Sequence, residues 1–563
     1  MPIQIESPKF TQLIEKLWNY LLANDMTTQL MEGKIITSLP PITETEIATS
    51  NKRLEQFIEE LLLLDSEDIN EDEHILVKSV LWNLRNQIER SKYFLLDFPL
   101  CPYSFPYTDV ANSMARYNFS SEQDIKDYLP LIGLLSNGFK KYIDMLHQQE
   151  AKGITIPSQE IPAIIKILQI FDCSPTEHPF YIKASRLGQI GGKNSKLVES
   201  FLRDLESKIK NDFIPNVQNL IEFLSTEYQD KSNFLVGLGQ YPQGKDYYRF
   251  LCKFYTNLAF TPEEIHEIGL QQLKQIVNEI SQMIQGLVQK DNLSDFFAVI
   301  EEFPELRDYF SQDMQQFLYD TLNEIEPLLT QQFLTIPPTP FSLKPLPSHL
   351  AESMTFGYYQ TPFSGGGKGT YYFNEQNKDP KSMIRMRSII YHEIYPGHHL
   401  QMATVFVSKN LPRLFRGMWE GAFVEGWAEY ATDIASELGL MTNPLHRLSR
   451  LIAEKFFSLR LIVDTGLNYF DWGYEKTFEF LKSNDYGTDK EIKTEILRYA
   501  VDLPGQALSY RMGYLEFKKL RRLTQEKLGE KFDLRKYHDQ ILKYGAIPLP
   551  ILANDVLKLK INP

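Results

Sequence analysis

Apolar residues recur at intervals of three and four along most of this chain, which is the pattern of amphipathic helices. Residues 54–64 and 213–228 are clear examples. Another helix is expected to begin at Thr261, which can cap it, with Pro262 in the first helical position and acidic residues behind it. We expect this helix to run to about residue 286. The pattern predicts a mainly α fold.

The only convincing β region follows a proline-rich stretch at residues 336–347, which should end the preceding helices. Tyr371, Tyr372 and Phe373 are aromatic residues of the kind that favour strands. We expect a small sheet here, whose edge could pair with the backbone of an extended peptide. The alternative is a surface hairpin. The glycines at 365–367 do not form a phosphate-binding loop, because Gly369 follows Lys368 where Ser or Thr is needed. A flexible loop over the cleft is expected instead.

Composition narrows the class of protein. The net charge of -14 and the pI of about 5.4 disfavour nucleic-acid binding. Residues 1–9 have no signal-peptide pattern, and no apolar run reaches the length of a membrane span. Three widely spaced cysteines give no disulfide framework. We therefore expect a cytoplasmic protein without membrane or nucleic-acid partners, while its oligomeric state is not indicated.

Histidines are concentrated in one short segment, since His392, His398 and His399 are three of the chain's ten. Glu393 follows the first of them, and Glu425 lies shortly downstream in the run 423–431. Two histidines and a later glutamate form the ligand set of a catalytic zinc site, in which the glutamate after the first histidine is the general base. The pattern predicts Zn²⁺ bound by His392, one more histidine and Glu425, with Glu393 as the base.

The spacing of these histidines does not fit a straight helix. The position four residues after His392 is Pro396, and His398 would lie about 240° around the helix from His392. His399 would lie on the correct face but about 10 Å along the axis. A break at Pro396-Gly397 would bring His398 to zinc if two residues loop out, or His399 if three do. We favour His398, with His399 facing the cleft as a hydrogen-bond donor or packing in the core.

Further site residues are expected downstream. Tyr510 could donate a hydrogen bond to the oxyanion of the transition state, and Gln506 lies one helical turn before it. Arg498 or Arg511 could bind a peptide carboxylate, although packing and solvated charge are the ordinary roles of such residues. Glu429, one turn beyond Glu425, could orient a ligand imidazole, but a solvated helix carboxylate is the preferred interpretation.

The two motifs together resemble the bacterial family known as domain of unknown function 885, regarded as zinc peptidases related to the helical gluzincins. The similarity extends over the C-terminal two-thirds and includes residues 237–239, 261–269, 369–374, 463–466 and 504–510. Two positions depart from the family pattern: Asn468 replaces a histidine, and Glu429 replaces an apolar residue. The resemblance implies a two-lobed helical zincin-like fold, with a small sheet beside the active-site helix.

The chain length of 563 residues also favours two lobes, because a single core stops growing at about half that size. We expect an N-terminal helical region, 1–190, and a zinc-binding catalytic region, 191–563, which could form one continuous domain. The expected activity is that of a zinc metallohydrolase, specifically a metallopeptidase that cleaves short peptides. One alternative is a zinc amidase acting on a modified amino acid. Another is a metal-free binding protein on the same scaffold, which the presence of Glu393 disfavours.

Overall fold

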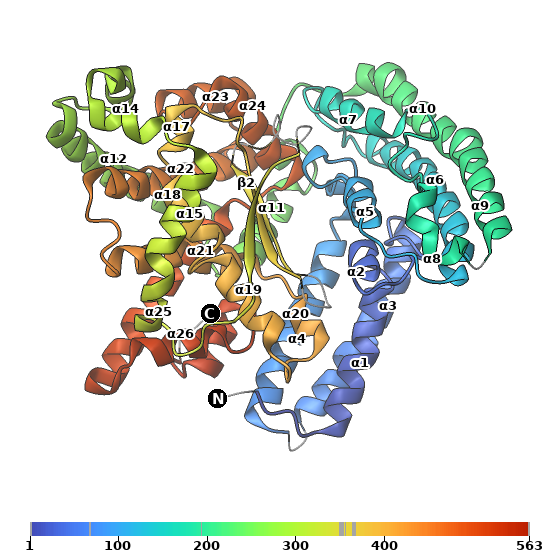
Figure 1. Cartoon of the computed structure of the whole chain (residues 1–563), viewed down its shortest axis with the longest axis horizontal. Helices are drawn as coiled ribbons and strands as arrows, with labels where there is room; N and C mark the ends of the chain where they lie inside the picture. The colour runs from blue at the N-terminus through green and yellow to red at the C-terminus, as the bar shows by residue number, and fades with distance from the viewer. Residues whose placement is uncertain are drawn as a thin grey trace. The chain divides into compact units, whose positions relative to one another are not determined.

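The computed structural model describes residues 3–66, 69–192, 194–347, 354, 356–362 and 367–560. Helices dominate it, and the described part contains one small sheet, as the sequence predicted (Figure 1). Contacts within the chain define two compact units. The first comprises Met1–Thr11, Leu64–Asn83 and Tyr248–Pro563, and the second comprises Gln12–Leu63 and Leu84–Tyr247. None of the described helices is both long and apolar enough to span a membrane.

The second unit is helical and has an aromatic core. Its longest helix, α6, starts with a capping box in which Ser121 and Asp124 satisfy each other's backbone N–H groups. Phe139 of α6 packs edge-on against Phe213, which in turn contacts Phe180. The helices that lie wholly in this unit are α2 (Met26–Met31), α5 (Pro106–Met114), α6 (Glu122–Glu150), α7 (Ile161–Leu168), α8 (Gly188–Gly191), α9 (Ser195–Lys208) and α10 (Ile214–Phe223). Helices α1 (Pro8–Leu22), α3 (Glu44–Asp65), α4 (Glu71–Ser91) and α11 (Gly244–Thr256) contain the unit boundaries.

The first unit contains every candidate site residue. Its helices are α12 (Pro262–Val288), α13 (Leu293–Ala298), α14 (Pro304–Phe310), α15 (Met314–Ile325), α17 (Pro380–Met383), α18 (Met386–Glu393), α19 (His398–Val407), α20 (Arg413–Arg416), α21 (Gly421–Glu437), α22 (Pro444–Asn468), α23 (Tyr474–Ser483), α24 (Asp489–Leu497), α25 (Leu508–Leu528), α26 (Leu534–Leu542) and α27 (Leu549–Ile551). A short π-helical segment, Arg498–Asp502, follows α24.

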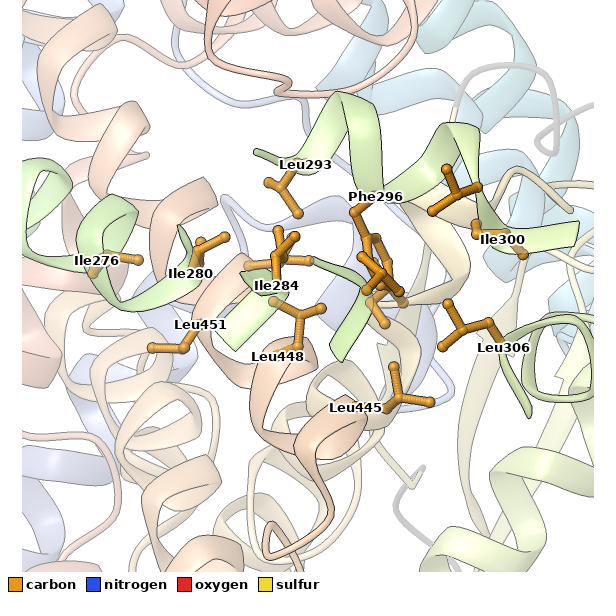
Figure 2. Packing of buried hydrophobic residues seen from close by; sticks show 14 residues of the cluster. Ile276, Ile280, Ile284, Leu293, Phe296, Ile300, Leu306, Leu445, Leu448 and Leu451 are labelled. Carbon is orange, nitrogen blue, oxygen red and sulfur yellow. The ribbon is translucent and has the colours of Figure 1, made fainter. Parts of the chain in front are cut away.

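Helices α12 and α22 form an apolar pair within this unit. Thr261 caps α12 and its capping box is complete, as the sequence predicted. Ile276, Ile280 and Ile284 recur every four residues and therefore lie on one face. Figure 2 shows this row beside Leu445, Leu448 and Leu451 of α22, with α13 closing over it. Burial of this cluster holds in place the N-terminal half of α22, whose later turns reach the site.

The sheet has the order β1-β3-β2, so the predicted strand β3 (Gly369–Phe373) is its centre. Strand β1 (Phe341–Pro345) runs parallel to β3, and β2 (Gly357–Gln360) runs antiparallel to it. Tyr371 of β3 is fully buried, which excludes a surface hairpin. The expected glycine loop lies largely outside the described residues, at 363–366.

Helices α21 and α25 approach closely at two glycines. A Cβ atom on Gly426 would lie 2.6 Å from Cα of Gly513, and one on Gly513 would lie 2.2 Å from the carbonyl oxygen of Ala422. No other residue could be accommodated without moving one helix. This contact sets the spacing between Glu425 on α21 and Tyr510 in the first turn of α25.

Candidate metal centre

The helix that carries His392 is broken at the predicted place. Helix α18 ends at Glu393, Ile394 has a non-helical ψ of -87°, and the Tyr395–Pro396 peptide bond is cis. The chain resumes helical geometry at His398, the first residue of α19. A Cβ atom on Gly397 would lie 1.8 Å from the carbonyl oxygen of His392, so this tight return requires glycine.

The break brings His398, rather than His399, beside His392 and Glu425. Glu425 Oε2 lies 3.5 Å from His392 Nε2 and 3.4 Å from His398 Nε2. The two imidazole rings are nearly perpendicular, at 86°, with their centroids 4.6 Å apart. One ligand atom from each of the three residues lies within 4.8 Å of the others. Ligand atoms about 2.0–2.2 Å from a tetrahedral zinc stand about 3.4 Å apart, so the cluster has the dimensions of a zinc site.

The donor atoms are also chemically suited to a cation. Glu425 Oε2 is buried and accepts no hydrogen bond from the described residues. Burial alone would raise the pKa of Glu425, but contacts with His392 and His398 hold it well below its ordinary value. The side chain is therefore an ionised carboxylate between two imidazoles, a combination that fits Zn²⁺. Burial raises the pKa of the adjacent Glu393, while His398 and His392 oppose this effect.

Glu429 contacts the other ring nitrogen of His392, with Oε1 3.1 Å from Nδ1. The preferred interpretation of Glu429 as a solvated carboxylate was wrong, because α21 is buried along this face and Glu429 is only 1 % exposed. Arg450 of α22 donates to Glu429 at 3.0 Å and also pairs with Asp433 and Glu454. An imidazole held at Nδ1 presents Nε2 in a fixed direction, here toward Glu425.

His399 is turned away from this cluster. Its Nε2 lies 3.0 Å from the carbonyl oxygen of Thr339, and its Nδ1 lies 2.7 Å from the hydroxyl of Tyr359. A carbonyl can only accept, so Nε2 carries the proton and Nδ1 accepts from Tyr359. Burial lowers the pKa of His399 to about 4, which keeps the ring neutral. In this structure neither nitrogen is available to a metal ion or a substrate, and His399 instead ties α19 to the sheet.

Of the downstream candidates, Tyr510 lies beside the cluster, whereas Arg498, Gln506 and Arg511 are bonded to other side chains of the protein. The ring of Tyr510 stacks on that of His392 at 6.0 Å and 16°, so the structure places Tyr510 at the cluster. Arg498 donates to Gln506 at 3.1 Å and pairs with Glu495 at 3.3 Å. Arg511 points to Glu454, at 2.8 Å, and to Gln272. Arg511 therefore belongs to the ion pairs around Arg450, and its charge is already balanced there.

Sequence reasoning missed the basic residues of α22. Arg460 lies over the ring of Tyr510 at 4.9 Å and pairs with Glu495 at 3.1 Å. Arg460 and Arg450 were both missed because they lie in a long amphipathic helix, where basic residues are ordinary. The departure at Asn468 has a structural role, because its amide donates to the backbone oxygens of Asp464 and Tyr499 at 3.0 and 2.9 Å.

Two solved structures are similar to this chain over almost its whole length. One is a "putative lipoprotein" from Colwellia psychrerythraea, which is 23% identical, has a TM-score of 0.87, and aligns over 98% of this chain and 99% of its own. The other is a "putative lipoprotein of unknown function" from Shewanella oneidensis, with 15% identity, a TM-score of 0.74, and coverage of 98% and 99%. Both likenesses show a shared fold.

No curated protein matches the sequence significantly. A family profile does, and it extends from residue 28 to residue 556, across both units. The chain belongs to the family described as "Bacterial protein of unknown function (DUF885)".

Proposed function

We propose that this protein is a zinc-dependent hydrolase of gluzincin type and that it cleaves short peptides. The observation that carries the proposal is the cluster of His392, His398 and Glu425, whose ligand atoms lie within 4.8 Å of one another. These three side chains would hold the ion. A zinc ion with three protein ligands supplies Lewis-acid activation of water and of a carbonyl group.

The neighbouring residues have the groups that peptide hydrolysis requires. Glu393 follows a ligand directly, and its carboxylate would take a proton from the attacking water and return it to the leaving amine nitrogen. Tyr510 stacks on His392, and its hydroxyl would donate a hydrogen bond to the oxygen of the tetrahedral intermediate. Glu429 would hold His392 in the orientation required for binding.

The first test separates metal binding from turnover. Purified protein should contain about one zinc per chain by metal analysis, and a mixed peptide library should yield cleavage products by mass spectrometry. Glu393→Gln should keep the zinc and lose turnover by a factor of about 10³ or more. Glu526→Gln, which removes an exposed carboxylate paired with Arg522 on α25, should have no effect on either. Absence of zinc from both native and refilled protein would overturn the proposal.

The second test uses the adjacent histidines as a matched pair. His398→Ala should lose the metal, because two remaining protein ligands bind zinc weakly. His399→Ala should keep it, since both nitrogens of His399 are engaged by Thr339 and Tyr359. Metal retained by the first variant and lost by the second would show that the ligand assignment is wrong.

A further inference from the structure

Among the residues that the structure describes, six arginines are buried, and five of them pair with a carboxylate. Arg387 pairs with Glu324, Arg450 with Glu429, Arg460 and Arg498 with Glu495, and Arg511 with Glu454. The sixth, Arg385, is 2 % exposed, and it forms no ion pair or side-chain hydrogen bond with any residue that the structure describes. Burial of a charge without a partner is unfavourable, so an unpaired buried arginine requires an explanation.

The surroundings of Arg385 leave its hydrogen-bonding edge free. Its guanidinium carbon lies 4.4 Å from the ring centroid of Phe356 and 4.8 Å from that of Phe456. Aromatic contacts stabilise a guanidinium through its faces, whereas carboxylates bind to its edge through two parallel N–H groups. The Nε–H on that edge is buried and has no acceptor among the described residues.

A second unpaired cation lies close by. Lys455, the residue before Phe456 on α22, is 6 % exposed and likewise forms no ion pair or hydrogen bond within the described part of the chain. Burial lowers its pKa to about 8, with Arg385 and Lys381 acting in the same direction and Asp485 opposing. The carboxylates that act on these two cations are engaged elsewhere. Asp485 pairs with Lys381 at 3.8 Å, and Glu491 accepts from the backbone of Thr488 and from Ser382. Glu495 pairs with Arg460 and Arg498.

The position of Arg385 relates it to the metal centre. It lies seven residues before His392 at the start of the same helix, which places the two side chains on one face about 10 Å apart along the axis. Both contact neighbouring rings of α22, Arg385 that of Phe456 and His392 that of Phe457. An extended peptide covers about 10 Å in three residues.

Building on the proposed function, we propose that Arg385 and Lys455 form a subsite for a carboxylate of the peptide substrate, two or three residues from the bond that is cleaved. The Arg385 fork would bind both carboxylate oxygens and Lys455 would add a second positive charge. If the carboxylate is the C-terminal one, the enzyme releases di- or tripeptides from the C-terminus. If it belongs to an aspartate or glutamate side chain, the enzyme selects acidic peptides.

The test measures binding separately from turnover. Three acetylated pentapeptides of alternating alanine and phenylalanine are used: the free acid, its C-terminal amide, and an amide whose last residue is glutamate. Calorimetry on zinc-loaded Glu393→Gln protein should show the free acid binding about 30-fold more tightly than the amide. Adding Arg385→Gln should bring that ratio close to one, and adding Lys455→Met should reduce it less. Arg447→Gln, which removes an exposed arginine charge from α22, is the control and should leave the ratio unchanged.

The outcomes distinguish a terminal carboxylate from a side-chain carboxylate, and they separate failure of the subsite from failure of the proposed function. If the glutamate amide binds tightly and this binding depends on Arg385, the subsite accepts an acidic side chain. If the glutamate amide binds weakly, the subsite accepts the terminal carboxylate. A ratio that Arg385→Gln does not change, or an equal loss for acid and amide, would overturn the subsite. Wild-type protein that binds with the expected ratio but never cleaves these peptides or the mixed library would contradict the proposed function alone.

Discussion

Two groups of buried charge each include residues of α22, and they differ in whether their charges are paired. Around Glu429 and Arg450 every charge has a partner of opposite sign, and the chain of contacts continues through Glu454 to Arg511. Around Arg385 and Lys455 two cations lie together, and neither forms an ion pair with a residue that the structure describes. The first arrangement holds the imidazole of His392, a proposed metal ligand, from within the protein. The second leaves two buried cations without an ion-pair partner among the described residues, which in the proposed subsite a bound carboxylate would supply. The same residue types would then serve structure in one place and recognition in the other.

The largest expected effect comes from breaking the paired group. Arg450→Met leaves the carboxylates of Glu429, Asp433 and Glu454 buried with less compensation, so the free energy of unfolding should fall by about 3–5 kcal/mol. Urea denaturation of the metal-free protein measures this. Arg447→Gln on the exposed face of the same helix should change it by less than about 0.5 kcal/mol. A loss below about 1 kcal/mol for Arg450→Met would show that the pairing contributes little.

A smaller effect is expected from Glu429→Gln, which keeps a hydrogen-bond acceptor for His392 but removes its charge. Zinc affinity, measured by competition with a chelator, should fall by about 10- to 100-fold. Glu437→Gln on the same helix removes a more exposed carboxylate paired with Arg521 and provides the control. Equal affinities of the Glu429 variant and the wild type would mean that Glu429 does not orient the ligand.

The unpaired group should respond with the opposite sign. Arg385→Met replaces a buried cation, which forms no ion pair with any described residue, with an apolar side chain between two rings, so stability without ligand should stay the same or rise by about 1 kcal/mol. Thermal and urea unfolding measure this. A loss of more than about 2 kcal/mol would place Arg385 with the structural arginines.

The last prediction is a pH dependence of stability. The pKa of Lys455 is about 8 in the folded protein, below its ordinary value of 10.5, so between these values the unfolded chain binds more protons than the folded one. The free energy of unfolding should therefore rise as the pH increases from about 8 to 10.5, because the unfavourable burial of the charged Lys455 is relieved over this range; below 8 Lys455 should add no pH dependence. When the free energy of unfolding is plotted against pH across this range, the wild type and Lys455→Met should have different slopes. Parallel slopes would show that Lys455 is solvated like an ordinary lysine.

Much of the fold could be predicted because it depends on local patterns. The apolar spacing of α12, its cap at Thr261 and the aromatic strand β3 are all visible in short stretches of sequence. Strands β1 and β2 were missed because β1 lies within the proline-rich stretch and because both depend on β3 for pairing. The boundaries of the two compact units were also not visible, since the second unit is assembled from two separate segments.

In the candidate site, too, residues within short motifs could be predicted and residues that depend on distant contacts could not. His392, His398, Glu425 and Tyr510 were singled out from motifs, and the structure brings them together. The burial of Glu429 could not be seen, because it depends on residues distant in the sequence, among them Arg450 of α22, which donates to its carboxylate. Arg385 carries no sequence signal at all: its unusual feature is the absence of a partner, which only the fold can reveal.

The adjacent histidines have a mechanical consequence. His398 belongs to the metal cluster, while His399 is hydrogen-bonded to Tyr359 on β2, an edge strand of the sheet. A single peptide bond joins the two residues, so displacement of this edge strand would pull directly on the backbone of a proposed metal ligand. Under the proposed function, a substrate that paired with that strand would thus be coupled to the proposed metal site through the chain itself.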